Sequence, residues 1–419
     1  MTSSATHRAI DAVWRIESAR LIAGLTRIVH NVAVAEDLAQ DALVAALEQW
    51  PEWGIPERPA AWLMAAAKRR GIDALRRRVT LERKQKLIER ELEILQQLDQ
   101  LDLAAQVEHV QDDILRLIFM TCHPVLSREA RVALTLRLLG GLSTPEIARA
   151  FLVSEGTVAQ RIVRAKRTLA EAKVPFEVPG REQLAERMSA VLEVIYLVFN
   201  EGYAATAGER WIRPSLCADA LRLGRILAAL MPREPEVHGL LALMELQASR
   251  LRARVGGQGE PVLLGDQDRA RWDHLLVQRG LAGLRRAEEL SGALGPYTLQ
   301  AAIAACHARA RSVEETDWPR IVALYDGLTA LTGSPVVELN RAVAVTMAFG
   351  PEAGLELVDS LTDEPALRGY HLLPTVRGDL LVRLGRLPEA REEFVRAADL
   401  CENEPERALL LSRAGACLT

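Results

Sequence analysis

The stretch GLSTPEIARAFLVSEGTVAQRIVRAK, residues 141–166, constrains the fold more tightly than any other part of the chain. Ser143 and Glu146 have the spacing of a capping box, which predicts the start of a helix. Ser154 can cap a second helix, whose apolar positions recur at intervals of three and four residues: Val158, Ile162, Ala165 and Leu169. The pattern predicts a helix-turn-helix. An ordinary amphipathic helix pair with solvated arginines is the alternative.

The other face of the second predicted helix is polar and basic. Its side chains are Gln160, Arg161, Arg164 and Arg167. A short helix with such a face fits a recognition helix lying in a major groove.

The rest of the chain also favours helices. Alanine and leucine dominate the apolar residues, whereas aromatic residues make up only 4% of the 419 residues. An all-α fold of two to four domains is therefore predicted. Uninterrupted apolar runs stay well below the length of a membrane span, and no signal peptide opens the chain. We therefore expect a cytoplasmic protein without membrane contact.

Several classes of chemistry lack their residue patterns in this sequence. The cysteines are five in number, far apart and never paired as CxxC, so neither a disulfide framework nor a metal site is expected. The Cys122-His123 neighbours are expected to be structural. Asp266 and Asp268 form a DxD in GDQDR, but a charged loop between helices explains it better than metal binding. With no P-loop, nucleophile elbow or HExxH, we expect no enzyme and no cofactor.

Charge is distributed unevenly along the chain. Residues 1–180 contain 25 Lys or Arg against 23 Asp or Glu, and residues 181–419 contain 27 against 33. The acidic net charge therefore belongs to the rear half, and the clustered basic charge of the front half indicates that only this half meets nucleic acid.

Three consecutive segments before residue 80 carry distinct patterns. AEDLAQDALVAALEQW, residues 35–50, predicts a helix with one apolar and one acidic face, either solvated or free to dock on a basic partner. PEWGIPERP, residues 51–59, predicts a loop because it holds three prolines and a glycine. The next predicted helix places six cations in the eleven residues 68–78, a density typical of phosphate binding.

Tryptophans lie just before this basic helix. Aromatic side chains in that place can stack on unpaired bases, or they can belong to the core. We expect core packing for Trp62 and exposure for Trp53. An acidic stretch follows, with eight acidic residues and one arginine between Glu89 and Asp113, which suggests a solvated linker or surface helix.

A repeat is visible near the C-terminus. Five small and large residues of GDLLVRLGRLPEAREEFVRAADL have the spacing of a tetratricopeptide repeat: Gly378, Leu381, Ala390, Phe394 and Ala397. Weaker matches to the same repeat occur at Ala353 with Leu357 and at Ile321 with Tyr325. A period near 34 residues predicts stacked helix pairs.

In their order and spacing, these motifs resemble a sigma factor of the extracytoplasmic-function group. The resemblance covers residues 8–173 and rests on AEDLAQDA, the PxAWLxxxAxxRxIDxLRR helix and the helix-turn-helix. The remainder is similar to the long tetratricopeptide-like extension of one subgroup, on weaker signals: FNEGYAAT (199–206), LLGDQDRARWD (263–273), GPYTLQAAIAACHA (295–308) and the last repeat.

The resemblance implies four parts in order along the chain. Residues 1–80 would be the region 2 domain, 81–112 the acidic linker and 113–175 the region 4 domain with its helix-turn-helix. Residues 176–419 would be an α-solenoid of tetratricopeptide-like helix pairs.

The resemblance also assigns contacts to individual residues. Core RNA polymerase would be met by Glu36, Asp37, Gln40 and Asp41. The minus-ten element of the promoter would be met by Trp53, Arg58, Lys68, Arg69, Arg70, Arg76 and Arg77. The minus-thirty-five element would be met by Ser154, Thr157, Ala159, Gln160, Arg161, Val163, Arg164 and Arg167.

Some positions depart from the family pattern. Leu152 stands where many helix-turn-helix motifs have glycine. Ala159 and Val163 offer no hydrogen bonds, so base readout would rest on Gln160 and Arg161, with apolar contacts to thymine methyls.

The implied function is that of an alternative sigma factor, which binds core RNA polymerase, recognises promoter DNA and initiates transcription. Its extension would regulate the front half through an intramolecular or protein partner. The alternative is a tetratricopeptide-containing helix-turn-helix regulator that is not a polymerase subunit, although this leaves the first 78 residues without a role.

Overall fold

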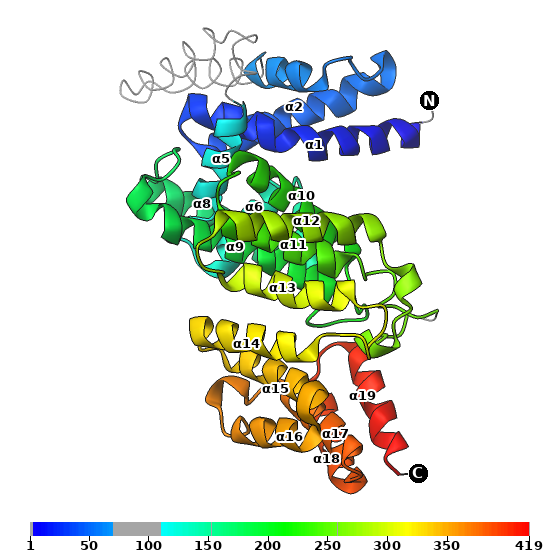
Figure 1. Ribbon diagram of the computed structural model, residues 1–419. Coiled ribbons are helices and arrows are strands. Elements are labelled where there is room, and N and C mark those ends of the chain that lie inside the picture. The colour runs from blue at the N-terminus through cyan, green and yellow to red at the C-terminus, as the bar shows by residue number, and fades with distance from the viewer. Residues whose placement is uncertain (1–2, 70–109, 152, 258, 419) are drawn as a thin grey trace. The chain divides into compact units, whose positions relative to one another are not determined.

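The protein is described by a computed structural model, which covers residues 3–69, 110–151, 153–257 and 259–418. Over these residues the chain is helical and contains no β-strand, so the all-α prediction is confirmed (Figure 1). Two compact units are present, Met1–Ile195 and Tyr196–Thr419, and each is described by itself. Within the described ranges, every helix is too short or too polar to span a bilayer.

The first unit begins with two long helices that pack together, α1 (Ser3–Val29) and α2 (Val32–Trp53). The Asn31 side chain caps α2 by accepting the N–H groups of Ala33 and Val34 at 2.9 and 3.2 Å. A further helix occupies residues 59–69. Trp62 on this helix is half-buried and meets the buried Trp50 edge to face, with ring centroids 5.2 Å apart, so it lies at the edge of the core.

The loop predicted for residues 51–59 is shorter than expected. Helix α2 continues through Pro51 and ends at Trp53, and only residues 54–58 lie outside helices. Pro51 lies in the last turn of α2, where its missing N–H removes a single helical bond. Gly54 ends the helix with a φ of 85°, and its N–H donates to the Trp50 carbonyl at 2.9 Å.

Five further helices are found among the described residues after 109: α5 (Val110–Thr121), α6 (Arg128–Leu138), α7 (Thr144–Ala150), α8 (Glu155–Glu171) and α9 (Arg181–Tyr203). The first part of α9 packs on the earlier helices. Arg187 donates to the Phe119 carbonyl at 2.7 Å, and Glu193 pairs with Arg128 at 3.1 Å and Arg131 at 3.4 Å. The boundary between the units therefore falls inside α9.

Over its described residues, the second unit contains the end of α9 and ten further α-helices. Two of its short 3₁₀ helices, η2 (Leu264–Asp266) and η3 (Arg269–Arg271), lie near the residues considered below. The remaining α-helices are α10 (Pro214–Leu230), α11 (Pro235–Ala248), α12 (His274–Leu290), α13 (Pro296–Arg309), α14 (Trp318–Thr332), α15 (Pro335–Phe349), α16 (Pro351–Ser360), α17 (Leu372–Arg383), α18 (Leu387–Leu400) and α19 (Glu404–Ala416). Neighbours in sequence pack on one another from α13 to α19.

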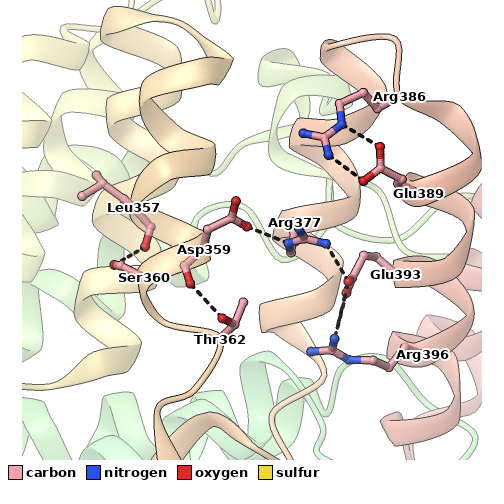
Figure 2. Close-up of polar contacts among 9 residues, drawn as sticks. All are labelled: Leu357, Asp359, Ser360, Thr362, Arg377, Arg386, Glu389, Glu393 and Arg396. Carbon is pink, nitrogen blue, oxygen red and sulfur yellow. Dashed lines mark hydrogen bonds and ion pairs between the residues drawn. The ribbon is translucent and has the colours of Figure 1, made fainter.

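The helix pair α17 and α18 carries the residues of the predicted repeat. Gly378 is small because a Cβ there would lie 2.8 Å from the ring of Phe394, which is 1% exposed. Arg377 ties the pair to α16, because its guanidinium binds both Asp359 and Glu393 at 2.8 Å (Figure 2). The helix pair is confirmed, and its assignment to the tetratricopeptide class stays a prediction.

The loop after α9 is held by the far end of the chain. The buried Asn403 donates from Nδ2 to the carbonyls of Ala205 at 3.1 Å and Arg210 at 2.9 Å. Backbone bonds from Gly208 to Glu402 and from Glu404 to Gly208 extend this contact. The loop therefore takes its shape from the start of α19.

Candidate nucleic-acid interface

Both helices of the predicted helix-turn-helix begin with the caps that the sequence indicates. The Ser143 N–H donates to the Glu146 carboxylate at 2.8 Å, and the Glu146 N–H donates to the Ser143 hydroxyl at 3.4 Å, which completes the capping box. The Thr157 N–H donates to the Ser154 hydroxyl at 3.1 Å. Ser154 and Thr157 thus fix the start of α8. Leu152 lies outside the described residues.

Helix α8 divides into a buried and a free face. The predicted core positions are buried: Val158, Ile162, Ala165 and Leu169. The predicted DNA-facing positions lie on the other side, where Arg161 is half-buried and the rest are exposed: Ala159, Gln160, Val163, Arg164 and Arg167. Val163 keeps 65% of its surface exposed. An apolar side chain with that exposure at the middle of a polar face is suited to touching a thymine methyl.

The residues predicted for the minus-ten element are only partly described. Trp53 is 80% exposed at the end of α2, and Arg58 and Arg69 are also exposed. Lys68 is half-buried. Arg70, Arg76 and Arg77 fall outside the described residues, as does most of the predicted acidic linker. The exposed ring of Trp53 is available for stacking, in contrast to the buried Trp50.

The acidic face of α2 is not wholly free, which corrects one expectation. Asp37 is exposed, and Gln40 and Asp41 are half-buried, but Glu36 is only 3% exposed. The sequence pattern did not predict this burial, because Glu36 lies on the border between the apolar and acidic faces of the helix.

Two cations of the helix-turn-helix module hold the Glu36 carboxylate. Arg137 of α6 approaches Oε1 at 2.7 Å, and Lys166 of α8 forms an ion pair with Oε2. Gln40 also donates to Oε1 at 2.7 Å. Burial by itself would raise the pKa of Glu36, but the charges and hydrogen bonds of Lys166 and Arg137 outweigh it and lower the pKa. Glu36 is therefore a charged link between the two modules.

A second ion pair supports the same contact. Arg27 of α1 approaches Asp113 of α5 at 3.0 Å, and the Asp113 side chain is 3% exposed. Beside these links lies a cleft of about 460 Å³, lined on one side by α2 and on the other by the capping box of α7. Its lining includes Gln40, Val44, Arg137, Ser143 and Glu146. Part of the predicted docking face therefore borders the helix-turn-helix in this structure.

One group of side chains in the second unit has the composition of a metal site. His371, Cys401 and Glu406 place one ligand atom each within 4.8 Å of one another. The Nε2 atom of His371 lies 3.2 Å from a Glu406 carboxylate oxygen, and Cys401 Sγ lies 3.8 Å from the other oxygen, so these contacts account for the closeness of the three side chains without a metal. Sequence spacing could not reveal this group, because thirty residues separate the first two members. Asp268 caps η3 through the Ala270 N–H at 2.9 Å, which supports a structural reading of the DxD.

Comparison with known proteins gives matches along most of the chain. Residues 16–80 match the family described as Sigma-70 region 2, and residues 116–169 match Sigma-70, region 4. Residues 187–288 match a family of unknown function (DUF6596). An uncharacterized protein of Rhizobium meliloti (strain 1021) is 46% identical over 392 residues, which is 92% of this chain and 90% of that protein. No solved structure matches.

Proposed function

Because the chain belongs to the sigma-70 family, with region 2 and region 4 domains followed by a C-terminal extension, we propose that it is an alternative sigma factor of the extracytoplasmic-function group. It binds core RNA polymerase, recognises promoter DNA and initiates transcription. The observation that carries the proposal is the presence of both matched regions on one chain, in the order that a two-element promoter reader needs.

The helix-turn-helix supports the part of the proposal that concerns the minus-thirty-five element. Capped ends and a continuous buried stripe hold α8 rigidly, so its free face presents fixed side chains to a groove. Gln160 and Arg161 supply hydrogen-bond donors for base edges, and Val163 supplies an apolar contact. Arg164 and Arg167 are exposed cations suited to phosphates.

The first module supports the part that concerns polymerase and the minus-ten element. Asp37 is exposed on α2 and can meet a basic partner, whereas Trp53 offers an exposed aromatic ring and Arg58 an exposed cation. Stacking on an aromatic ring is worth about 1–3 kcal/mol per base, enough to offset part of the work of unstacking. No nucleotide hydrolysis is needed for such a step.

The link through Glu36 sets a condition on promoter binding. The two promoter elements lie about 25 base pairs apart, and at about 3.4 Å per base pair this is roughly 85 Å. An ion pair of 2.7 Å between Glu36 and Arg137 cannot persist while each module occupies its own element. We infer that the modules separate when the protein joins polymerase and DNA. The chain between residues 69 and 110 is long enough to allow this, at up to about 3.3 Å per residue.

Purification with core RNA polymerase, followed by transcription in vitro, tests the proposal. The full chain should bind core polymerase and direct transcription from its own promoter, and Asp37→Arg should weaken both. Glu356→Arg, a charge reversal at an exposed site in the extension, is the matched control and should change neither.

The alternative of a regulator outside the polymerase makes the opposite prediction. Such a protein would bind a specific duplex by itself and would not copurify with core polymerase. Failure of the wild-type chain to bind core polymerase would therefore favour that reading.

A further inference from the structure

Three arginines of the second unit lie close together without an acidic partner. Arg250 and Arg254 follow α11, and Arg269 begins η3. Arg250 is only 9% exposed, and Arg254 and Arg269 are half-buried. Among the residues that the structure describes, no carboxylate lies within 4.0 Å of any of these guanidinium groups.

Aromatic rings separate the three cations. Arg254 lies 3.8 Å from the ring centroid of Tyr203 and 5.2 Å from that of Trp211. Arg250 lies 5.9 Å from Tyr203 and 5.7 Å from Trp272, and Arg269 lies 4.9 Å from the same indole. The arginines and rings therefore alternate, and we call this set of six residues the arginine ladder. Cation–π contacts reduce the free-energy cost of burying these positive charges, but they do not neutralise them.

Other half-buried arginines in the second unit have their charge balanced by a carboxylate. Arg213, at the end of the same loop as Trp211, pairs with Glu201 at 2.6 Å, and Arg225 pairs with Glu245 at 2.9 Å. Arg377 binds two carboxylates at once (Figure 2). The arginine ladder departs from this rule, so its charge needs a different explanation.

Unused hydrogen-bond donors lie in the same place. The indole N–H groups of Trp211 and Trp272 and the Nε–H of Arg254 are buried and have no partner among the described residues. Buried donors are almost always bonded, so a group of them beside excess positive charge indicates an acceptor that is absent from the protein itself. Arg250 and Arg269 also lower the pKa of His307 to about 4, after a larger effect of burial, which keeps a fourth positive charge out of the site.

The main chain supplies only part of what the guanidinium groups require. Arg269 donates to the carbonyls of His307 and Ala310 at 2.6 Å, and Arg254 donates to that of Tyr203 at 3.1 Å. These bonds orient the side chains without cancelling their charge. Burial and then the charge of Arg250 lower the pKa of Arg269, whereas the exposed Glu314 and Glu315 each oppose this by a smaller amount.

We propose that the arginine ladder is a binding site for a phosphate group carried by a small molecule. Three guanidinium groups are more than enough to neutralise the double negative charge of a phosphate monoester, and guanidinium donors suit its oxygens. Arg250 already donates to the Tyr203 hydroxyl at 2.7 Å and to the Gln247 side chain, which leaves its other N–H groups for a ligand. The burial of Arg250 and Trp272 favours a small ligand over a macromolecule. Free inorganic phosphate and a phosphorylated metabolite share this chemistry.

The site joins segments that sequence analysis could only note separately. Tyr203 belongs to FNEGYAAT, Arg269 and Trp272 belong to LLGDQDRARWD, and His307 belongs to GPYTLQAAIAACHA. The proposal concerns the extension itself and does not rest on the sigma-factor function of the front half.

Titration of the full chain with inorganic phosphate and with adenosine monophosphate tests the proposal, in a buffer free of phosphate. Calorimetry gives the affinity, and sodium chloride at matched ionic strength controls for screening. We expect saturable binding of at least one of the two probes. Arg254→Gln and Arg269→Gln should each weaken it at least tenfold. Arg252→Gln removes an exposed charge two residues away and should leave it unchanged.

Each outcome decides the proposal. Binding of inorganic phosphate identifies free phosphate as a sufficient ligand, and binding of the nucleotide alone assigns the site to a phosphorylated metabolite. Absence of saturable binding to the wild-type chain overturns the proposal, whatever the variants do. Equal affinities of the wild type and of folded Arg254→Gln and Arg269→Gln also overturn it.

Discussion

The Glu36 carboxylate on α2 forms an ion pair with Arg137 on α6 at 2.7 Å, although the sequence places these residues in two different modules. Lys166 on α8 completes the contact. A residue of the predicted polymerase-docking helix is thus held by the module that is expected to read the upstream promoter element. The two proposed activities of the front half therefore share one side chain, and separating the modules is a step of its own.

Removing a cation from Glu36 should destabilise the first unit. Arg137→Gln leaves a carboxylate that is 4% exposed with one cation fewer, and a loss of about 1–3 kcal/mol in the free energy of unfolding is expected. Urea denaturation measures it. Arg167→Gln is the control, because Arg167 and Glu171 form a pair that is 71% and 70% exposed, and a change below about 0.5 kcal/mol is expected. Equal losses of unfolding free energy in the two variants would show that the Arg137 ion pair stabilises the protein no more than a surface pair does.

The stabilisation from Glu36 should depend on pH with a definite sign. Its pKa is lowered in the folded protein, so the folded state favours the ionised form. The contribution is complete above the ordinary carboxyl pKa of 4.5 and is lost as pH falls through the lowered value. The difference in unfolding free energy between the wild type and Glu36→Gln should therefore shrink between pH 6 and strongly acid conditions. A constant difference would rule out the ionised carboxylate as its source.

Arg161 and Arg167 should differ in what they contribute to transcription. Arg161→Ala removes a donor from the base-reading face of α8, so transcription should fall mainly at promoters with the cognate upstream element. A bidentate base contact is worth about 1–3 kcal/mol, or roughly 5- to 150-fold. Arg167→Ala should weaken binding about equally on all templates and reduce its salt dependence. Uniform loss on every template for Arg161→Ala would reassign that residue to phosphate contact.

A truncation before α9 should destabilise the first unit. Arg187 and Glu193 bond to helices of the first unit, so a chain ending at Pro175 lacks these bonds, whereas a chain ending after Tyr203 keeps them. We expect the longer fragment to have the higher melting temperature. When transcription is compared with and without the extension, the shortened chain should therefore end after α9. A shorter fragment of equal stability would show that this part of α9 is dispensable.

Gly378→Ala should destabilise the second unit even though alanine is the better helix former. The added Cβ would lie 2.8 Å from the Phe394 ring, and overpacking of this kind costs about 1–3 kcal/mol. Gly415→Ala is the control, because a Cβ there meets nothing within 4 Å, and a gain of up to about 1 kcal/mol is expected. Thermal unfolding followed by circular dichroism separates the two. A neutral Gly378→Ala would mean that the ring moves aside.

Sequence reasoning succeeded where the signal is local. Ser143 with Glu146, Ser154 and the buried stripe of α8 could be predicted because caps and helical periods involve residues only three or four positions apart. The burial of Glu36 could not be predicted, because it depends on Arg137, which lies 101 residues away. The arginine ladder was hidden for the same reason, since no short-range pattern brings Tyr203 to Arg254. The loop after Trp50 was misjudged at its start because proline content marks a breaker without fixing the residue at which the helix ends.

The bonds of Asn403 to Ala205 and Arg210 bear on the order in which the chain is made. A ribosome synthesises the chain from the N-terminus, at about 5–20 residues per second. The loop that carries Trp211 must therefore wait for nearly two hundred further residues before its partner in α19 leaves the exit tunnel. The first unit ends at Ile195, so all of its residues are synthesised well before then. A chain released early would carry every residue of the helix-turn-helix but would lack the bonds that Asn403 makes to the loop of Trp211.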